Sequence, residues 1–586
     1  VKVAKLRERG PSQEPDAKRA KLREQGALID KTTELVHSEI TNRLHFLREV
    51  GLGYLTLDRA TRTLSGGEIE RVNLTSCLGA SLTNTLFVLD EPTVGLHPRD
   101  VGALVSVMHG LRDKGNTLVV VEHEEAVMQA ADHLLDLGPG AGEHGGEIVA
   151  SLSSQRMRQV TALKSAPRST TLPYLLGQVS IPVPPVRRAP AGFLRIRGAT
   201  RHNLLDLDVD VPLGVFACVT GVSGSGKSTL VHDVLYQNLA GALRIESQED
   251  PAPLRSLTGT EQLTDARIVD QSPLSRTPRS TPIVYLGAFD LVRQLFASSP
   301  DGQLAGIQPG YFSFNSGAGR CERCSGNGFE KVEMQFLSDL YLTCPECNGS
   351  RYNQAALEIR YEGKTIADIL ALTVTEALSF FRQGAAGSTR RAATREAASK
   401  TRILNALQPL EELGLGYLRL GQPLNTLSGG EAQRLKLCTI LTETLGRKNL
   451  RSRPDPGSAS SLLILDEPTT GLHFGDIARL LAVFQRLVNA GHSLLVIEHN
   501  LDVIKSADYL IDVGPGAGAE GGRISASGTP EDVAVTDTET ARYLAPVLSP
   551  GAVPTTGGDQ KPTGDPDSRT PRSPSAAIQI SGAREH

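Results

Sequence analysis

The chain has 586 residues, of which 39% are hydrophobic, and its formal net charge is −4 at pH 7. A single hydrophobic core rarely supports a chain of this length, so two or more domains are expected. Apolar runs such as residues 118–121 and 462–465 are far shorter than the roughly 20 residues that a membrane-spanning helix needs. The net charge gives no support to a uniformly basic surface, so any nucleic-acid-binding surface must be a local patch.

The N-terminal residues and the cysteines indicate the compartment. Residues 1–9 mix basic and acidic side chains without an apolar stretch, which is unlike a secretory signal. Four of the seven cysteines form two close pairs, whereas Cys77, Cys218 and Cys438 stand alone. This distribution is not typical of a secreted disulfide scaffold. We therefore expect a cytoplasmic protein with a metal site and no membrane partner.

An internal duplication organises the chain. The sequence GLGYLTLDRATRTLSGGE at residues 51–68 returns as GLGYLRLGQPLNTLSGGE at residues 414–431. LFVLDEPTVGLH at residues 86–97 likewise returns as LLILDEPTTGLH at residues 462–473. The second copy carries an additional polar stretch at residues 446–461, which we expect to be a surface loop.

A phosphate-binding loop occurs in the second half only. GVSGSGKSTL, at residues 221–230, follows an apolar run and precedes a helical pattern, which is the context that such a loop requires. Its glycines allow backbone N–H groups to face phosphates, its lysine reaches the β- and γ-phosphates, and Ser228 is placed to bind Mg²⁺. The residues expected to contact ATP here are Gly221, Ser223, Gly224, Gly226, Lys227, Ser228 and Thr229. Residues 1–50 are charged and helix-prone, so about half of an ATPase module is expected to be missing in front.

Paired carboxylates end one apolar strand in each half. In the second half we expect Asp466 to bind Mg²⁺ and Glu467 to polarise the attacking water. His499 ends the next strand and is predicted to contact the γ-phosphate, while Gln271 is predicted to sense the metal and the water. A structural histidine and a polar loop residue remain the alternatives for these last two.

The LSGGE sequence at residues 64–68 and 427–431 resembles the signature of ABC-type ATPases. A serine and two glycines before a helix present N–H donors to a phosphate. In that family the signature serves the nucleotide bound by the opposite module. The resemblance therefore implies one composite site, in which Ser65, Gly66 and Gly67 close the second-half residues. The other site would contain Asp90, Glu91, His123 and Ser428 but no phosphate loop, and it should not bind ATP normally.

Two cysteine pairs, Cys321 with Cys324 and Cys344 with Cys347, run into glycine-containing turns. This spacing is typical of structural zinc. Four thiolates leave no open coordination position, so the metal should hold the fold rather than act in catalysis. Two disulfides are the alternative.

The fold class expected is α/β, with ABC-type P-loop ATPase modules, a helical signature domain and a Cys₄ zinc-binding insertion. Residues 1–167 would be the C-terminal part of a first module. Residues 168–545 would be a complete second module, with the zinc- and DNA-binding insertion at about 270–380. Residues 182–190 read as an extended linker and residues 384–395 as a connector, and residues 546–586 are expected to be disordered.

The insertion decides the family. It reads VDQSPLSRTPRSTP, FSFNSGAGRCERCSGNG and MQFLSDLYLTCPECNGSRYN, between the phosphate loop and the second signature. With the motifs above, it is similar to the UvrA family, the damage-recognition subunit of the bacterial excinuclease, over residues 49–544. The resemblance implies a homodimeric ATPase that uses ATP, Mg²⁺ and Zn²⁺, binds damaged double-stranded DNA in excision repair and passes it to UvrB. It would not itself cut DNA.

The resemblance also has a gap and leaves alternatives. In the family, the missing front part engages UvrB, so UvrB binding is in doubt for this chain. The candidate DNA-phosphate contacts are Arg276, Arg279, Arg320, Arg323, Lys331 and Arg351, with an ordinary solvated surface as the alternative. The remaining functional alternatives are a UvrA-like paralogue in resistance to DNA-binding drugs, a non-repair ABC ATPase of a transporter or ribosome, and an idle DNA-binding scaffold.

Overall fold

The computed structural model describes residues 16–61, 64, 66–79, 83–140, 142, 145–159, 166–246, 250–272, 274, 277, 279–334, 340–383, 390–447 and 460–548. The predicted disordered tail at residues 546–586 lies outside them from residue 549 onward, and its first three residues are helical instead, because they complete α20 (Glu539–Leu548). The first half contains α1 (Asp16–Glu49), α2 (Gly66–Gly79), β1 (Leu86–Asp90), α3 (Pro98–Asp113), β2 (Thr117–Val121), α4 (Glu125–Ala130), β3 (His133–Gly138), β4 (Glu147–Ser153), α5 (Ser154–Met157) and α7 (Leu172–Leu175).

The second half begins with the strands around the phosphate loop and continues through a helical lobe to a last group of strands and helices. Its elements up to the cysteine pairs are β5 (Gly192–Arg201), β6 (Leu204–Leu213), β7 (Phe216–Thr220), η4 (Thr229–Tyr236), α8 (Gln237–Leu243), β8 (Ser256–Thr258), η5 (Thr260–Gln262), β9 (Leu263–Val269), α9 (Pro282–Tyr285), α10 (Phe289–Ser298), α11 (Pro300–Leu304) and η6 (Pro309–Phe312). The remaining elements are β10 (Phe329–Val332), β11 (Leu340–Thr343), α12 (Gln354–Glu358), α13 (Ile366–Ala371), α14 (Val374–Arg382), α15 (Arg390–Glu412), η7 (Leu424–Thr426), α16 (Gly429–Arg447), β12 (Ser460–Asp466), α17 (Phe474–Asn489), β13 (Ser493–Ile497), α18 (Leu501–Ser506), β14 (Tyr509–Gly514), η8 (Gly518–Glu520), β15 (Arg523–Gly528), α19 (Pro530–Ala534) and α20 (Glu539–Leu548).

The sheet of the second half has six strands in the order β15-β14-β7-β13-β12-β9. All neighbours are parallel except β14 and β15. The strands β7 and β13 are buried along their whole length, as expected for central strands of a sheet covered on both faces. Phe216 and Cys218 face one hydrophobic cluster, whereas Ala217 and Val219 face the other. The phosphate loop therefore leaves the centre of a well-packed sheet.

In the first half the corresponding strands form two separate pairs, β1 with β2 and β3 with β4. Their counterparts β13 and β14 both pair with β7. In the part of the chain that the structure describes, no strand joins β2 to β3, and Val88, Val119 and Leu137 are 65%, 48% and 68% exposed. This agrees with the sequence, which has a phosphate-loop strand in its second half only.

The predicted boundary at residue 167 separates α7 from the elements that it contacts. Leu172 of α7 is buried in one cluster with Leu134 of β3 and Leu152 of β4. Ser169 and Thr171 both donate hydrogen bonds to Asp136 of β3. We therefore assign α7 to the first half and use "first half" for the elements through α7 and "second half" for those from β5 onward.

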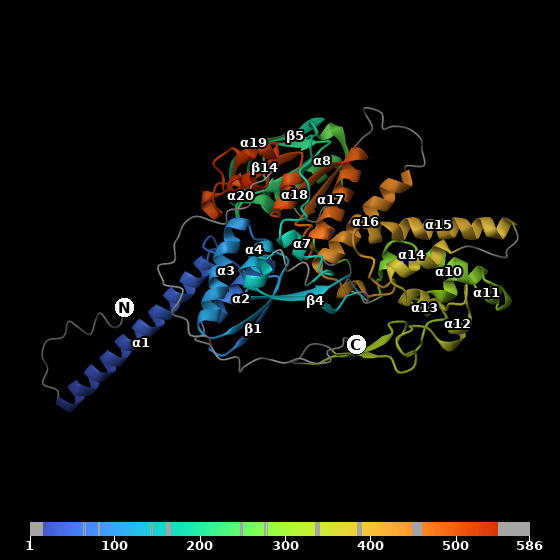
Figure 1. Cartoon of the computed structure of the whole chain (residues 1–586), viewed down its shortest axis with the longest axis horizontal. Coiled ribbons are helices and arrows are strands. Elements are labelled where there is room, and N and C mark those ends of the chain that lie inside the picture. The colour runs from blue at the N-terminus through green and yellow to red at the C-terminus, as the bar shows by residue number, and fades with distance from the viewer. Residues whose placement is uncertain are drawn as a thin grey trace.

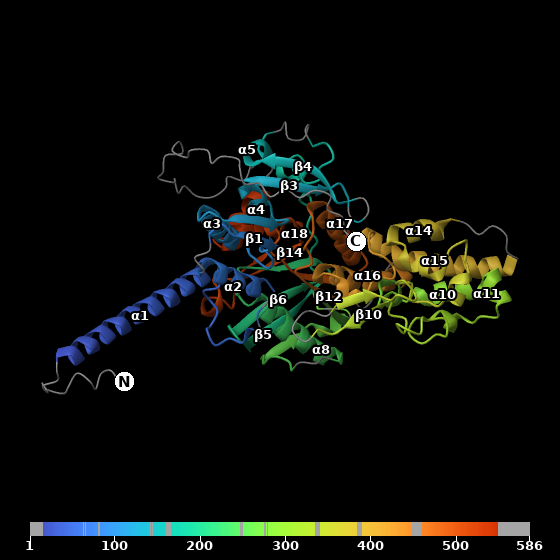
Figure 2. The ribbon, with the colours of Figure 1, turned by 90° about the horizontal axis from the view of Figure 1, so that it is seen from below.

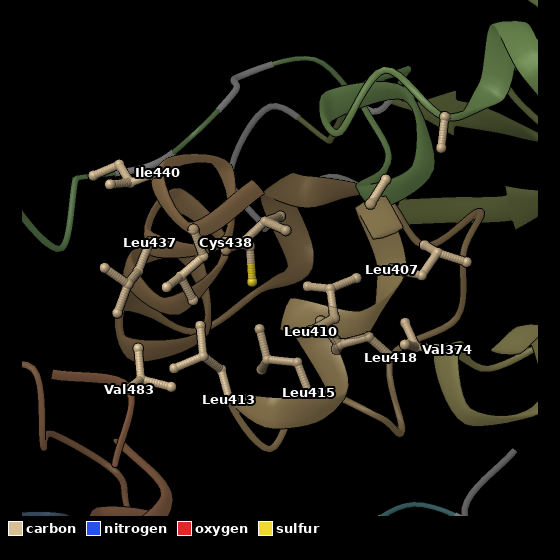
Figure 3. Packing of buried hydrophobic residues seen from close by; sticks show 14 of the residues in the cluster. Val374, Leu407, Leu410, Leu413, Leu415, Leu418, Leu437, Cys438, Ile440 and Val483 are labelled. Carbon is tan, nitrogen blue, oxygen red and sulfur yellow. The ribbon is translucent and has the colours of Figure 1, made fainter. Parts of the chain in front are cut away.

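A helical lobe formed mainly by α10–α15 lies at the opposite end of the molecule from α1 (Figures 1 and 2). Its base is a buried cluster that includes Leu407 and Leu410 of α15 and Leu437 and Cys438 of α16 (Figure 3).

The predicted connector at 384–395 is partly wrong, because residues 390–395 begin α15. The predicted loop at 446–461 lies largely outside the described residues, although β12 begins at Ser460.

Candidate nucleotide site and four-cysteine cluster

The phosphate loop connects β7 to η4 and has a backbone that requires glycine. Gly221, Gly224 and Gly226 have φ values of +132°, +75° and +107°, a region that residues with a Cβ atom rarely adopt. A Cβ atom at Gly221 would lie 2.0 Å from the carbonyl oxygen of Val513. The sequence motif is therefore explained by local conformation and by close packing against β14.

Lys227 is folded back on this loop. Its Nζ donates hydrogen bonds to the carbonyl oxygens of Gly221, at 2.9 Å, and Val222, at 3.0 Å. Burial lowers the pKa of Lys227, an effect that the nearby carboxylates of Glu467 and Asp466 oppose. A buried ammonium group on a glycine-rich loop that leads into a helix is suited to an anionic ligand such as a polyphosphate.

Asp466 is the last residue of β12, and its carboxylate meets a histidine from the helix that follows the phosphate loop. The Nε2 of His232 lies 3.0 Å from the Oδ2 of Asp466. Burial lowers the pKa of His232, but the adjacent carboxylate of Asp466 outweighs burial and raises it. The sequence analysis did not identify His232. Its only signal was a histidine within the otherwise mostly apolar run TLVHDVLY.

Glu467 follows with a φ of +45° and is surrounded by the other predicted catalytic side chains. The Nε2 of His499 lies 3.8 Å from its Oε1. Gln271 donates from Nε2 to the carbonyl oxygen of Glu467, at 3.3 Å, and to the Oγ1 of Thr470, at 3.1 Å. Burial raises the pKa of Glu467, and Asp466 raises it further. The second half thus brings Lys227, Gln271, Asp466, Glu467 and His499 to one place.

His499 is buried beside Glu467 and has an unused polar atom. Burial lowers its pKa well below the ordinary value, and Lys227 lowers it further, so the imidazole is neutral. Its Nδ1 atom is buried without a hydrogen-bond partner among the described residues. Buried polar atoms normally have a partner, so this nitrogen fits a bound ligand. The donor set of the loop together with this orphaned atom suits a nucleotide and its magnesium ion.

Residues of the first half contact this site directly. Ser223 donates from Oγ to the carbonyl oxygen of Gly95, at 3.0 Å. A Cβ atom at Gly95 would lie 3.3 Å from both carboxylate oxygens of Glu467, and one at Gly224 would lie 2.8 Å from the ring of Tyr54. The sequence analysis did not identify Tyr54 or Gly95, because nothing in either short segment says which distant residues it contacts.

The signature of the first half enters through α2. Gly66 and Gly67 begin this helix, whereas Ser65 lies outside the described residues. Arg71, one turn further on, is 2% exposed, and its Nε and Nη1 atoms have no hydrogen-bond partner among the described residues. Its charge lowers the pKa values of Glu467 and His499. The first signature helix thus places a cation near the carboxylates of the second half.

The same arrangement is repeated with the halves exchanged. The Nε2 of His123 lies 3.8 Å from the Oε1 of Glu91, and a Cβ atom at Gly471 would lie 3.2 Å from that same oxygen. Ser428 accepts a hydrogen bond from the N–H of Glu431 at the start of α16. Asp90 ends β1. This second arrangement is called the mirror site below; the sequence offers it no phosphate loop.

A cavity of about 210 Å³ lies between the two halves. Its lining includes Glu91 and His123 from the first half and Glu467 and His499 from the second. The two sets of carboxylates therefore share one interface, at which the loop of each half faces the glutamate of the other.

The four cysteines meet beside the β10–β11 hairpin. The Sγ atoms of Cys321 and Cys344 are 4.0 Å apart, and those of Cys324 and Cys347 are 3.6 Å apart. All four lie within 4.8 Å of one another and are buried. A zinc–sulfur distance of about 2.3 Å implies tetrahedron edges of about 3.8 Å, whereas a disulfide needs about 2.05 Å. The geometry fits a zinc-binding cluster and not the disulfide alternative.

The basic residues near this cluster differ in accessibility. Arg351 is only 7% exposed, donates from Nη2 to the carbonyl oxygen of Gly421 and lies 5.1 Å from the ring of Phe314. Its assignment as a phosphate contact is therefore wrong, because packing against the lobe removes it from the surface. Arg276 lies outside the described residues.

The other candidates lie nearer the surface and are held by neighbouring oxygens. Arg323 pairs with Glu330 at 2.6 Å, and Lys331 pairs with Glu333 at 3.1 Å. Arg320 donates to the carbonyl oxygen of Asn315, and Arg279 donates to the side chain of Asn327. Exposed pairs of this kind contribute little to stability and exchange partners readily, so these four remain candidates.

Comparison with known proteins identifies close relatives. The chain is 51% identical over 508 residues to the UvrABC system protein A of Thermus thermophilus and 47% identical over 516 residues to that of Bacillus subtilis. These alignments cover 86% and 88% of this chain but 50% of each relative. The chain therefore spans about half the length of the curated relatives that it matches. No family model matches it.

A solved structure supports the same relationship. The crystal structure of UvrA2 from Deinococcus radiodurans is 45% identical and superposes with a TM-score of 0.77, covering 87% of this chain and 57% of that one. The α/β ABC ATPase fold expected from the sequence is thus confirmed, together with a four-cysteine cluster of the zinc-binding type. None of the helices in the described residues is long and apolar enough to cross a membrane.

Proposed function

We propose that this chain, which belongs to the UvrA family, hydrolyses ATP at one composite site and couples hydrolysis to the recognition of damaged double-stranded DNA in excision repair. The observation that carries the proposal is the contact between halves at the phosphate loop. Ser223 is bonded to Gly95, and Gly95 also faces Glu467. A loop from one half thus touches both the phosphate-binding and the water-activating residues of the other.

The residues of the site divide the chemistry of phosphoryl transfer. Lys227 and the loop N–H groups would bind the β- and γ-phosphates, and Ser228 and Asp466 would hold the magnesium ion, which neutralises charge on the transferred phosphoryl group. Glu467 would orient and deprotonate the attacking water. Its raised pKa makes it a stronger base than an exposed glutamate. Gln271 would be oriented by its bonds to Glu467 and Thr470.

His499 would contribute a neutral hydrogen-bond donor to the bound nucleotide, and Arg71 would contribute a positively charged one. The neutral imidazole of His499 would donate a hydrogen bond to the γ-phosphate from its orphaned nitrogen. Arg71 would add a positive charge from the first half, close to where negative charge develops. We infer from these roles that turnover occurs at the complete site and is negligible at the mirror site.

DNA binding is proposed for the surface around the four-cysteine cluster. Zinc would fix the β10–β11 hairpin, and Arg320, Arg323, Lys331 and Arg279 would contact backbone phosphates after leaving their present acceptors. The relatives of Thermus thermophilus and Bacillus subtilis are UvrABC system proteins A, which supports a role in that system. Homodimer formation belongs to the same proposal.

The test is ATP hydrolysis by the purified chain with and without duplex DNA that carries a bulky lesion. Turnover stimulated by damaged DNA and lost in Lys227→Ala is the expected result. Arg323→Ala should weaken DNA binding several-fold while leaving DNA-independent turnover unchanged, because the ion pair of Arg323 is with Glu330 of the hairpin and not with the nucleotide site. Turnover that Lys227→Ala retains would contradict the proposed site.

A further inference from the structure

The two LDEP-containing loops each end in a histidine that caps the following helix. His97 precedes α3 and His473 precedes α17. The Nδ1 atom of His97 accepts the N–H of Arg99, and that of His473 accepts the N–H of Gly475, both at 3.2 Å. In a neutral imidazole one nitrogen accepts and the other donates. The ring proton of each histidine therefore lies on Nε2.

Both Nε2 atoms reach across to the other half. The Nε2 of His97 lies 3.4 Å from the Oγ1 of Thr540, which belongs to α20 of the second half. The Nε2 of His473 lies 3.2 Å from the Oγ1 of Thr171, immediately before α7 of the first half. Exchanging the two halves converts one contact into the other. The duplication has therefore preserved one histidine–threonine contact in each direction between the halves.

Each threonine hydroxyl in turn donates a hydrogen bond to a buried aspartate. Thr540 donates to the Oδ1 of Asp512 at 2.8 Å, and Thr171 donates to the Oδ1 of Asp136 at 2.9 Å. Asp512 lies on β14 opposite Thr220, the last residue of β7 before the phosphate loop. The chain His97–Thr540–Asp512 therefore connects the first-half loop to the strand pair that carries the phosphate loop.

Burial keeps the imidazole of His97 neutral. His97 is 1% exposed. Burial lowers its pKa to about 3, and the charges of Lys227 and Arg99 act in the same direction. Its ring lies edge-on to His499, with a centroid distance of 6.0 Å. The imidazole is therefore neutral at pH 7, with its proton on Nε2.

We propose that His97 is a positioning residue for ATP hydrolysis: its bond to Thr540 holds residues 93–97 of the first half against Ser223 and Glu467 of the complete site. Gly95, two residues before His97, supplies the contacts to both. The equivalent bond from His473 holds the other loop against Glu91 at the mirror site. This inference rests on the proposed ATPase function.

A matched pair of variants tests it. Thr540→Val and Thr171→Val each remove one hydroxyl group and keep the side-chain volume. Each takes one hydroxyl donor from a buried aspartate and leaves it another, Thr538 for Asp512 and Ser169 for Asp136, so their effects on stability should be alike. Thr540→Val should lower kcat about tenfold with KM for ATP within twofold of the wild type. Thr171→Val should leave kcat within twofold. Equal effects of the two variants on kcat would overturn the proposal.

Two further variants separate positioning from helix capping. His97→Asn keeps a good N-cap for α3 but is too short to reach Thr540, so it should lower kcat as much as Thr540→Val does. Thr540→Ser keeps the hydroxyl group and should restore kcat to within twofold of the wild type. A His97→Asn enzyme with unchanged kcat, or a Thr540→Ser enzyme as slow as Thr540→Val, would overturn the role.

A thermal double-mutant cycle keeps the test independent of turnover. If His97 and Thr540 interact, the fall in melting temperature of the variant carrying both His97→Asn and Thr540→Val is smaller than the sum of the single falls. Additive falls would overturn the contact itself. If the wild-type chain shows no turnover above Lys227→Ala, the proposed ATPase function fails, whereas the cycle still decides whether the contact exists.

Discussion

Substituting alanine for two glycines in equivalent loops distinguishes the complete site from the mirror site. Gly95 and Gly471 have φ values of +69° and +68°, so alanine at either position costs about 1–2 kcal/mol of backbone strain. The new Cβ atom would lie 3.3 Å from both carboxylate oxygens of Glu467 in one variant, and 3.2 and 3.5 Å from those of Glu91 in the other. The two variants should therefore lose similar amounts of stability. They differ in which glutamate is crowded, the proposed catalytic Glu467 or the mirror-site Glu91.

The kinetic effect follows from the crowding. A contact at 3.3 Å displaces the carboxylate by a few tenths of an ångström, and because a misplacement of about 1 Å costs on the order of 100-fold, Gly95→Ala should lower kcat about tenfold. Gly471→Ala should lower it less than twofold. Steady-state ATP hydrolysis, with melting temperatures as a check on folding, measures both. A loss of kcat in Gly471→Ala equal to that in Gly95→Ala would refute the reasoning.

Three further predictions concern stability. Lys400 is buried and bonded to Glu362 at 2.7 Å, so Lys400→Met should lower the unfolding free energy by about 2 kcal/mol in denaturant titration, with the less buried Lys364→Met as a control. Burial acts to raise the pKa of Asp270, but hydrogen bonds from Lys436 and Ser272 outweigh burial and hold the pKa below 3.8. The charged Asp270 carboxylate therefore stabilises the folded state above pH 3.8, and this contribution is lost as the pH falls through the lower pKa of the folded state. The gap in melting temperature between the wild type and Lys436→Met should accordingly narrow on acidification from pH 6 to pH 3, and a constant gap would contradict the assignment. Finally, metal analysis should find zinc bound by the four-cysteine cluster, and Cys347→Ser should lose that zinc and lower the melting temperature, whereas Cys218→Ser should retain it.

The residues that could be found from the sequence are those whose function fixes a local pattern. The phosphate loop needs glycines at fixed positions before a lysine, and Gly221, Gly224 and Gly226 indeed have positive φ values. The cysteine pairs needed only short spacings on either side of a hairpin. For such motifs the local chain carries nearly all the geometric information, so the fold class was predictable.

The residues that were missed act through contacts between segments far apart in the chain. Tyr54, Gly95 and His97 lie in the first half but contact the phosphate loop, Glu467 or Thr540 of the second. Their partners are set by how the halves pack, which the sequence does not state. Arg351 illustrates the converse error, because its charge suggested a surface role while the packing of the lobe buries it.

The central claim is that hydrolysis requires the glutamate of the second half, next to the only phosphate loop in the sequence, and not its duplicate. Glu467→Gln and Glu91→Gln make the same chemical change at two equivalent positions. Each glutamate follows the aspartate in one copy of the duplicated LDEP sequence. ATP turnover should fall at least 100-fold in Glu467→Gln, since a general base contributes about 10²–10⁴-fold, while nucleotide binding persists. Glu91→Gln should retain turnover within about threefold. A Glu91→Gln enzyme as inactive as Glu467→Gln, or a Glu467→Gln enzyme that still turns over, would contradict the account.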